Sequence, residues 1–241
     1  MGTDLIETSG VFVRTVLSED LSFSSPLAYV TVLRDVEDRQ VAGPVVIVNL
    51  AGTDAFVGHG QVSALPSFSS TVLVRGTVTG DLLVVVSMEN IGHGELLARE
   101  LGWTDFYGGV PAKPVLLRSP QTTIAEVALD PAAVLRQPGL PGGEEKFTVK
   151  ANLWFSPAGT DCGIHNSHDF IEVHTQISGF GRMQKFTSPD HGSLYEDQQL
   201  SPGATNPVPF CLEREGRFIY PWHQYRADTD CVWLAVEYHL S

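Results

Sequence analysis

Short segments rich in Val, Ile, Thr and aromatic residues recur along this chain of 241 residues, and Gly, Pro and Asp separate them. These residue types favour strands, because branched and aromatic side chains fit a pleated surface. Many short strands at close spacing predict an all-β fold, either a sandwich or a barrel. The expected strands cover residues 11–17, 27–37, 43–50, 71–78, 82–88, 113–119, 123–129, 147–155, 170–178, 217–227 and 231–240.

Helical patterns are few and short. Residues 94–102 read GELLARELG, and Gly102 is suited to cap the end of such a helix. Residues 130–137 read DPAAVLRQ, with Asp130 as the N-cap residue. A Gly-Asp pair in VTGDLL, residues 78–83, predicts a hairpin turn between two of the expected strands.

The segment QPGLPGGEEK at residues 137–146 is the best linker candidate, because Pro and Gly interrupt regular structure. It divides the chain into a β-rich N-terminal half, residues 1–136, and a C-terminal half, residues 147–241. Only His59 and His93 precede this segment, and the remaining histidines follow it. Chemistry that uses histidine is therefore expected in the C-terminal half.

The net charge of −13 argues against nucleic acid as a partner, because the 15 Lys and Arg residues form no basic cluster. The sequence contains no run of about 18 apolar residues, so it predicts no transmembrane helix. The N-terminus shows no signal-peptide or myristoylation pattern, and the three cysteines lack CxxC spacing. We therefore expect a cytoplasmic protein with reduced thiols whose partners include neither nucleic acid nor a membrane.

The stretch GIHNSHDFIEVHTQISG, residues 163–179, concentrates ligand-type side chains in a segment that otherwise resembles a strand. Alternate residues of a strand share a face, so His168, Glu172, His174 and Gln176 form one polar stripe. Such a stripe either faces water or lines a cavity that binds something polar or metallic. His168 and Glu172 are about 13 Å apart along an ideal strand, so joint binding of one ion requires a bend, a bulge or a loop at His168.

The spacing of this stretch resembles the first motif of the cupins. In that motif a glycine, five residues and His-x-His are followed by three or four residues, Glu, six residues and Gly. Gly159, His165, His168, Glu172 and Gly179 occupy the corresponding positions. The departure is at the first pair, because two residues separate the histidines. A loop or bulge between them would let both imidazoles point inward.

Residues 216–239 resemble the second cupin motif, in which a later strand supplies one more histidine. Pro221 precedes His223 here by two residues, a shorter spacing than the usual Pro-x-Gly-x-x-His. The resemblance covers roughly residues 150–240 and implies a cupin-type β-barrel, a double-stranded β-helix or jelly roll. The N-terminal half is then either a degenerate second cupin, giving two tandem barrels, or a set of strands that caps one barrel.

The resemblance implies one divalent transition metal, held by His165, His168, Glu172 and His223. Three imidazoles and a carboxylate suit Fe(II), Mn, Co, Ni, Cu or Zn, and we favour Fe(II) over Mn, Zn, Ni and Co. This ligand set leaves coordination positions open, as a catalytic site requires.

Further pocket residues follow from strand alternation. His174 is a candidate catalytic residue, as a general base or a substrate-orienting donor, and a core histidine is the alternative. Tyr225 shares a face with His223 and is a second catalytic candidate, or a core aromatic. Gln176, Arg182 and Gln184 are candidates for substrate binding, although for the last two we favour the alternative of ordinary solvation on an exposed hairpin. Part of residues 188–216 is expected to form a loop over the barrel mouth.

The first functional hypothesis is a mononuclear metal-dependent enzyme for a small polar organic molecule, with an Fe(II)-dependent oxygenase favoured. A metal-assisted isomerase, epimerase or lyase would use the same ligands. The third reading is a non-catalytic cupin that binds a small ligand, which the altered motifs favour. A homodimer formed through edge strands is expected by analogy with the fold.

Overall fold

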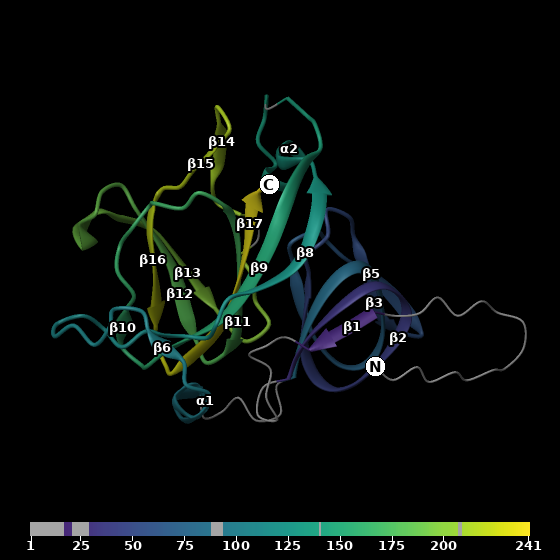
Figure 1. Ribbon diagram of the computed structural model, residues 1–241, viewed down its shortest axis with the longest axis horizontal. Helices are drawn as coiled ribbons and strands as arrows, with labels where there is room; N and C mark the ends of the chain where they lie inside the picture. Colours follow the sequence, from purple (N-terminus) through teal and green to yellow (C-terminus); the bar gives the residue numbers. More distant parts are fainter. Residues whose placement is uncertain (1–16, 21–28, 88–93, 140, 207–208) are drawn as a thin grey trace, which may run out of the picture.

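The computed structural model describes residues 17–20, 29–87, 94–139, 141–206 and 209–241. Figure 1 shows two bodies of strands side by side, one from the N-terminal part of the chain and one from the C-terminal part. Strands dominate and helices are short, so the all-β class expected from the sequence is confirmed.

The N-terminal body is one sheet with the strand order β1-β2-β5-β3-β4. Its strands are β1 (Leu17–Asp20), β2 (Val30–Asn49), β3 (Ala55–His59), β4 (Gln61–Leu65) and β5 (Ser70–Ser87). Val46 pairs with Val86 on one side and with Val72 on the other, so the two long strands bend and close the sheet on itself. We call β1 to β5 the N-terminal barrel.

The prediction of a hairpin at residues 78–83 is wrong. β5 continues through this segment, because Gly80 stays paired with Val36 and Leu82 with Arg34 across the Gly-Asp pair. The expected strands 71–78 and 82–88 are therefore one bent strand as far as Ser87, and 27–37 and 43–50 likewise merge into β2. Most of the expected strand 11–17 lies outside the described residues.

The C-terminal body is built mainly of two antiparallel sheets that face each other (Figure 1), with a small separate hairpin of β14 (Leu212–Arg214) and β15 (Arg217–Ile219). One sheet contains β11 (Ile171–Ser178), β17 (Cys231–Leu240), β9 (Glu145–Ser156), β8 (Thr122–Leu129), β7 (Leu117–Arg118) and β6 (Thr104–Asp105). The other contains β10 (Thr160–Asp161), β16 (Trp222–Ala227), β12 (Gly181–Phe186) and β13 (Leu194–Leu200). Two such sheets form the jelly-roll barrel expected for a cupin, and we call them the two-sheet barrel.

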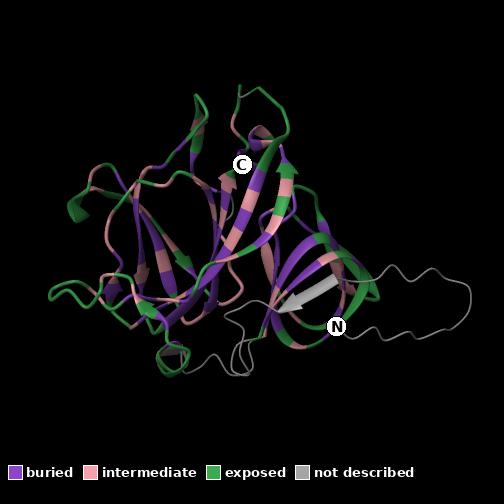
Figure 2. Ribbon diagram, in the orientation of Figure 1, coloured by how far each residue is buried: buried purple, intermediate pink, exposed green. Residues whose placement is uncertain are grey.

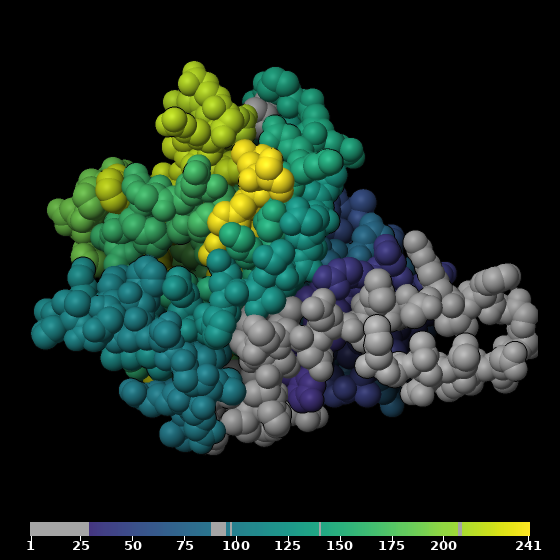
Figure 3. Space-filling model, in the orientation of Figure 1, coloured from purple at the N-terminus to yellow at the C-terminus, as the bar shows by residue number. Residues whose placement is uncertain are grey.

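The outer face of the β11-β17-β9 sheet packs against the N-terminal barrel. Leu153, Leu234 and Val236 belong to the same apolar cluster as Val46 and Val84. The Tyr238 hydroxyl adds a hydrogen bond to the Leu50 carbonyl at 2.7 Å. Burial alternates along these strands in Figure 2, and the space-filling view shows the two bodies in contact (Figure 3).

The hydrogen-bonded sheet crosses the expected linker at residues 137–146. β8 precedes this segment in the chain, yet it pairs along β9, with Thr122 opposite Ala151 and Leu129 opposite Glu145. The division into domains at the linker stays a prediction, and so does the interpretation of the N-terminal half as a degenerate cupin.

The helices lie where the sequence indicated. α1 spans Gly94–Glu100, and α2 spans Pro131–Leu135 behind the Asp130 side chain, which accepts a hydrogen bond from the Ala132 amide. A short 3-10 turn, η2, covers His191–Ser193. Among the described residues, no helix has the length and apolar character needed to cross a membrane.

Candidate metal centre

Three histidines converge at one end of the two-sheet barrel. His165 forms an isolated bridge with His223 of β16, with paired backbone hydrogen bonds of 2.9 and 2.8 Å. His168 lies in the loop before β11. Its Nε2 atom is 2.9 Å from Nε2 of His165 and 3.1 Å from Nε2 of His223. The loop at His168 thus brings together the imidazoles that a straight strand would hold apart.

Backbone carbonyls fix the orientation of two of these rings. Nδ1 of His165 is 2.9 Å from the Gly163 carbonyl, and Nδ1 of His223 is 2.9 Å from the Pro221 carbonyl. A carbonyl only accepts hydrogen bonds, so each Nδ1 carries the proton and each Nε2 presents a lone pair. These two Nε2 atoms and that of His168 face a common centre, an arrangement that suits a bound cation.

A protonated imidazole does not supply this cation at neutral pH. Burial and the neighbouring His165 lower the pKa of His168 to about 4. Burial and His165 lower the pKa of His223 to about 3. A divalent metal that accepts imidazole nitrogen would bind all three Nε2 atoms, with the ring protons carried on Nδ1. The ligand atoms all lie within 4.8 Å of one another, so this group could hold a metal ion.

Glu172 is not part of this three-histidine group. It lies opposite Glu237 of β17, and its backbone amide donates to the Tyr220 hydroxyl at 2.8 Å. Burial and the neighbouring Glu237 raise the pKa of the Glu172 carboxyl to about 8. The role of Glu172 as a fourth ligand stays a prediction.

Two aromatic residues that sequence reasoning missed surround the histidines. The Tyr220 ring lies 4.8 Å from the His168 ring, and its hydroxyl donates to the Phe170 carbonyl at 3.0 Å. The Phe210 ring lies 4.9 Å from the His223 ring. Phe210 comes from the segment 188–216 that was expected to cover the mouth. Part of that segment is instead regular structure, namely β13 and β14 (Leu212–Arg214).

His174, Gln176 and Tyr225 meet inside the barrel behind the three histidines. The His174 ring lies 4.9 Å from the Tyr225 ring and 5.5 Å from the Trp233 ring. The Tyr225 hydroxyl donates to Gln176 Oε1 at 2.6 Å. Burial lowers the pKa of His174 to about 3, so the imidazole is neutral. Their catalytic and substrate-binding roles stay predictions.

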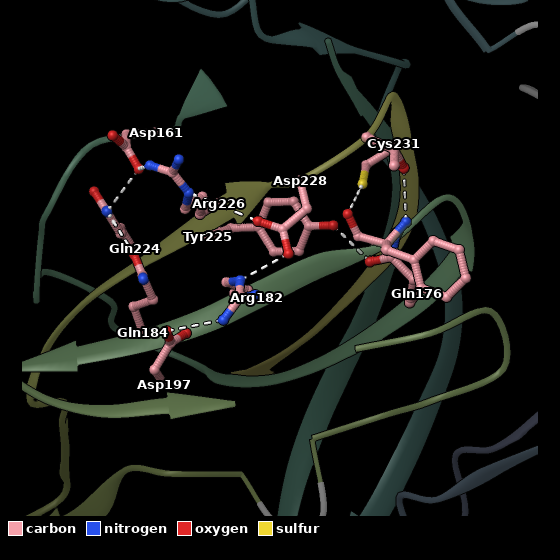
Figure 4. A network of polar contacts seen from close by, with 12 residues as sticks. Asp161, Gln176, Arg182, Gln184, Asp197, Gln224, Tyr225, Arg226, Asp228 and Cys231 are labelled. Atoms are coloured by element: carbon pink, nitrogen blue, oxygen red, sulfur yellow. Dashed lines mark hydrogen bonds and ion pairs between the residues drawn. The ribbon is translucent and has the colours of Figure 1, made fainter. Parts of the chain in front are cut away.

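Arg182 and Gln184 are not brought to the histidines. Figure 4 shows both in a network of polar contacts. They alternate along β12 with Met183 of the apolar core, so they lie on the outer face of the β12-β16 sheet. Arg182 forms ion pairs with Asp228 at 2.7 Å and Asp197 at 3.0 Å, and Gln184 accepts from Gln224 at 2.9 Å. The structure therefore gives no support to the predicted substrate-binding role of either residue.

Lys185 occupies the position at the mouth that sequence reasoning gave to its neighbours. It lies directly opposite His223 in the β12-β16 pair, on the same strand face as the core residue Met183. Its Nζ atom contacts Glu196 at 2.6 Å and lies 5.1 Å from the centre of the Phe210 ring. The apolar Met183 two residues earlier is the signal that could have identified this face.

A separate cavity of about 480 Å³ lies away from the histidines, between the N-terminal barrel and the β8–α2 segment. Its lining includes Arg34, Asp81, Glu126 and Asp130. None of the candidate site residues from the sequence lines this cavity.

Comparison with protein-family models and with curated proteins finds no match. Matching solved structures include a cupin 2 conserved barrel domain protein from Leptotrichia buccalis, at 9% identity and a TM-score of 0.28, covering 95% of this chain and 91% of that one. Oxalate decarboxylase from Bacillus subtilis matches at 15% identity and a TM-score of 0.30, covering 89% and 68% of the two chains.

Ectoine synthase from P. lautus matches at 16% identity and a TM-score of 0.27, covering 49% of this chain and 70% of that one. Likenesses at these TM-scores carry no argument about activity or substrate. The assignment of a cupin-type barrel therefore rests on the histidine spacing of the chain and on its two facing sheets.

Proposed function

We propose that this protein is a mononuclear metal-dependent enzyme of the cupin type that acts on a small polar organic molecule, with Fe(II)-dependent oxygenation as its reaction. The convergence of the Nε2 atoms of His165, His168 and His223 carries the proposal. Imidazole ligands suit iron as well as zinc, copper and nickel. Cytoplasmic location and a homodimer remain predictions.

The residues of the chain have separate tasks in this proposal. The Gly163 and Pro221 carbonyls hold two imidazoles in the ligating tautomer. Phe210 covers one side of His223 and excludes water there. Bound Fe(II) would supply open coordination positions for an oxygen of the substrate and for O2.

Oxygen consumption tests the reaction class. Protein loaded anaerobically with Fe(II) is mixed with a panel of small hydroxy and carbonyl compounds in an oxygen electrode. The His223→Ala variant, treated identically, is the control. We expect uptake of O2 by the wild type with at least one compound and none by the variant. No uptake with any compound would contradict the oxygenase and favour a binding protein.

One observation favours a second function, proton transfer by an isomerase, epimerase or lyase. The pKa of Glu172, raised to about 8 by burial and Glu237, lets this carboxyl hold or release a proton near neutral pH. Such an enzyme would exchange a carbon-bound proton of its substrate with solvent deuterium in the absence of O2. An oxygenase would leave that proton in place.

A further inference from the structure

Two buried polar atoms of the β11-β17-β9 sheet, both on its inner face, have no hydrogen-bond partner in the described part of the chain. They are Nδ2 of Asn152 and Nε2 of His174. Both side chains are buried, with exposed fractions of 0% and 3%. Burial without a hydrogen bond costs folding free energy, so such groups are uncommon in native proteins. A ligand that bonds them would recover this cost.

The orientation of the Asn152 amide is settled by its neighbour. The Trp154 indole Nε1 lies 3.0 Å from Asn152 Oδ1. An indole N–H only donates, so the atom facing it must be the amide oxygen and not the nitrogen. The unpartnered atom of Asn152 is therefore a donor, and it requires an acceptor oxygen or nitrogen.

The two groups lie on either side of a small residue. Ala235 of β17 is directly opposite Asn152 of β9 and also directly opposite His174 of β11. Residues opposite each other in antiparallel strands point to the same side of the sheet. The methyl group of Ala235 thus separates a buried amide from a buried imidazole on the inner face. His174 is close enough to His223 to lower the pKa of that histidine.

The surroundings favour an uncharged ligand group. The next row of the inner face, deeper in the barrel, consists of Trp154, Trp233 and Gln176, and none of these is charged. The row toward the histidines holds Glu172, Glu237 and Lys150, and its one cation, Lys150, lies directly opposite Glu237 and not beside the subsite. A charge buried over Ala235 would have no counterion in contact with it.

We propose that Asn152 and His174 form a binding subsite in the barrel for an uncharged hydroxyl or carbonyl oxygen of a small molecule. Asn152 donates to this oxygen. His174 adapts its tautomer, accepting from a hydroxyl or donating to a carbonyl. The inference deepens the proposed function by naming the substrate class, neutral hydroxy and carbonyl compounds, and rests on it only in calling the ligand a substrate.

Binding of hydroxyacetone, with lactate as its charged counterpart, tests the subsite by saturation-transfer NMR titration of the purified protein. His174→Phe keeps an aromatic ring between its neighbours and removes the nitrogens. Asn152→Asp keeps the acceptor for Trp154 and removes the donor. Ala235→Val fills space without changing either polar group. The matched control is His191→Phe, because His191 is an exposed histidine of η2.

We expect hydroxyacetone to bind the wild type and the control equally, and lactate to bind at least tenfold more weakly. Each of the three subsite variants should weaken hydroxyacetone binding about tenfold, the equivalent of one hydrogen bond at ~1.4 kcal/mol. His174→Phe should melt no lower than the wild type, because it removes an unpartnered polar group. Equal binding by all variants, absence of binding to the wild type, or tighter binding of lactate would overturn the proposal.

Metal analysis of the same samples separates this inference from the proposed function. Loss of hydroxyacetone binding in the variants, from a wild type that retains no metal, would refute the metal enzyme and leave the subsite standing. Retained metal with identical binding in all variants would refute the subsite alone.

Discussion

The two barrels of this chain are filled in opposite ways. The N-terminal barrel encloses an aliphatic cluster that includes Leu33, Ile47 and Leu83. The two-sheet barrel encloses aromatic rings and buried polar groups, among them Asn152 and His174. Both barrels are built from antiparallel strands. They therefore differ in the side chains that fill them, aliphatic in one and aromatic or polar in the other, and not in backbone pairing.

The β11-β17-β9 sheet shows both kinds of filling on its two faces. Its outer face carries Val173, Leu153 and Leu234 and packs against the N-terminal barrel. Its inner face carries the unpartnered amide and imidazole. Apolar burial on the outer face stabilises the sheet, and this leaves the inner face free to hold polar groups that cost stability.

The largest expected effect is on the aliphatic side of the comparison. Leu83→Ala should lower the free energy of unfolding by about 2–5 kcal/mol, because it empties part of a fully buried core. Val74→Ala, at a residue that is 64% exposed, should change it by less than about 0.5 kcal/mol. Urea unfolding measures both. Equal effects would show that the N-terminal barrel does not depend on its aliphatic core.

The next effect concerns the polar side. His223→Ala removes one of three converging lone pairs, so metal affinity should fall by more than about 100-fold, beyond the loss expected for an outer partner of a ligand. His191→Ala serves as the control because His191 is exposed. Competition with a chromophoric chelator gives the affinities. An unchanged affinity in His223→Ala would remove His223 from the ligand set.

Acid should reveal the buried imidazole of His174. Its pKa is about 3 in the folded protein and about 6.5 in the unfolded chain, so between these values the unfolded state binds the proton. Stability of the metal-free protein should therefore decrease as pH falls below about 6.5, by about 1.4 kcal/mol per pH unit for this residue, with no contribution above that pH.

Urea unfolding at pH 7, 6 and 5 measures this dependence in the metal-free wild type and in His174→Phe. The variant should lose stability less steeply toward low pH by the share of His174. Identical pH dependence in the two proteins would mean that His174 is not held neutral by burial.

The smallest effect is expected on the outer face of the β12-β16 sheet. Arg226 pairs with Asp161 at 2.9 Å, and both side chains are more than one third exposed. Arg226→Gln should cost at most about 1 kcal/mol, and less at high salt, because solvent and ions screen exposed pairs. A large loss of unfolding free energy that salt does not reduce would show that this network stabilises the barrel.

Sequence patterns indicated the strands and the candidate histidine ligands. They did not indicate which residues from distant segments contact those histidines. The two segments that contain these histidines, one with His165 and His168 and one with His223, could be identified because motif spacing is local. The face of β12 could not, because the turn before it leaves the alternation open by one residue. Lys185, and not Arg182, is the residue of β12 that pairs with His223.

Tyr220 and Phe210 show a second limit. Each contacts a histidine ring only because β16, the loop before β11 and the chain after β13 meet at the barrel mouth. The spacing of residues along the sequence does not predict that these three segments lie together. The continuity of β5 through Gly80 was missed for a related reason, because its pairing with β2 outweighs the local preference of Gly-Asp for a turn.

Metal stoichiometry tests the central claim most directly. Wild-type protein and the double variant His165→Ala/His168→Ala are loaded anaerobically with Fe(II), passed through a desalting column and analysed for iron per chain. The three converging Nε2 atoms predict about one iron per wild-type chain and almost none in the variant. A wild type that retains no iron, or a variant that retains as much as the wild type, would contradict the account.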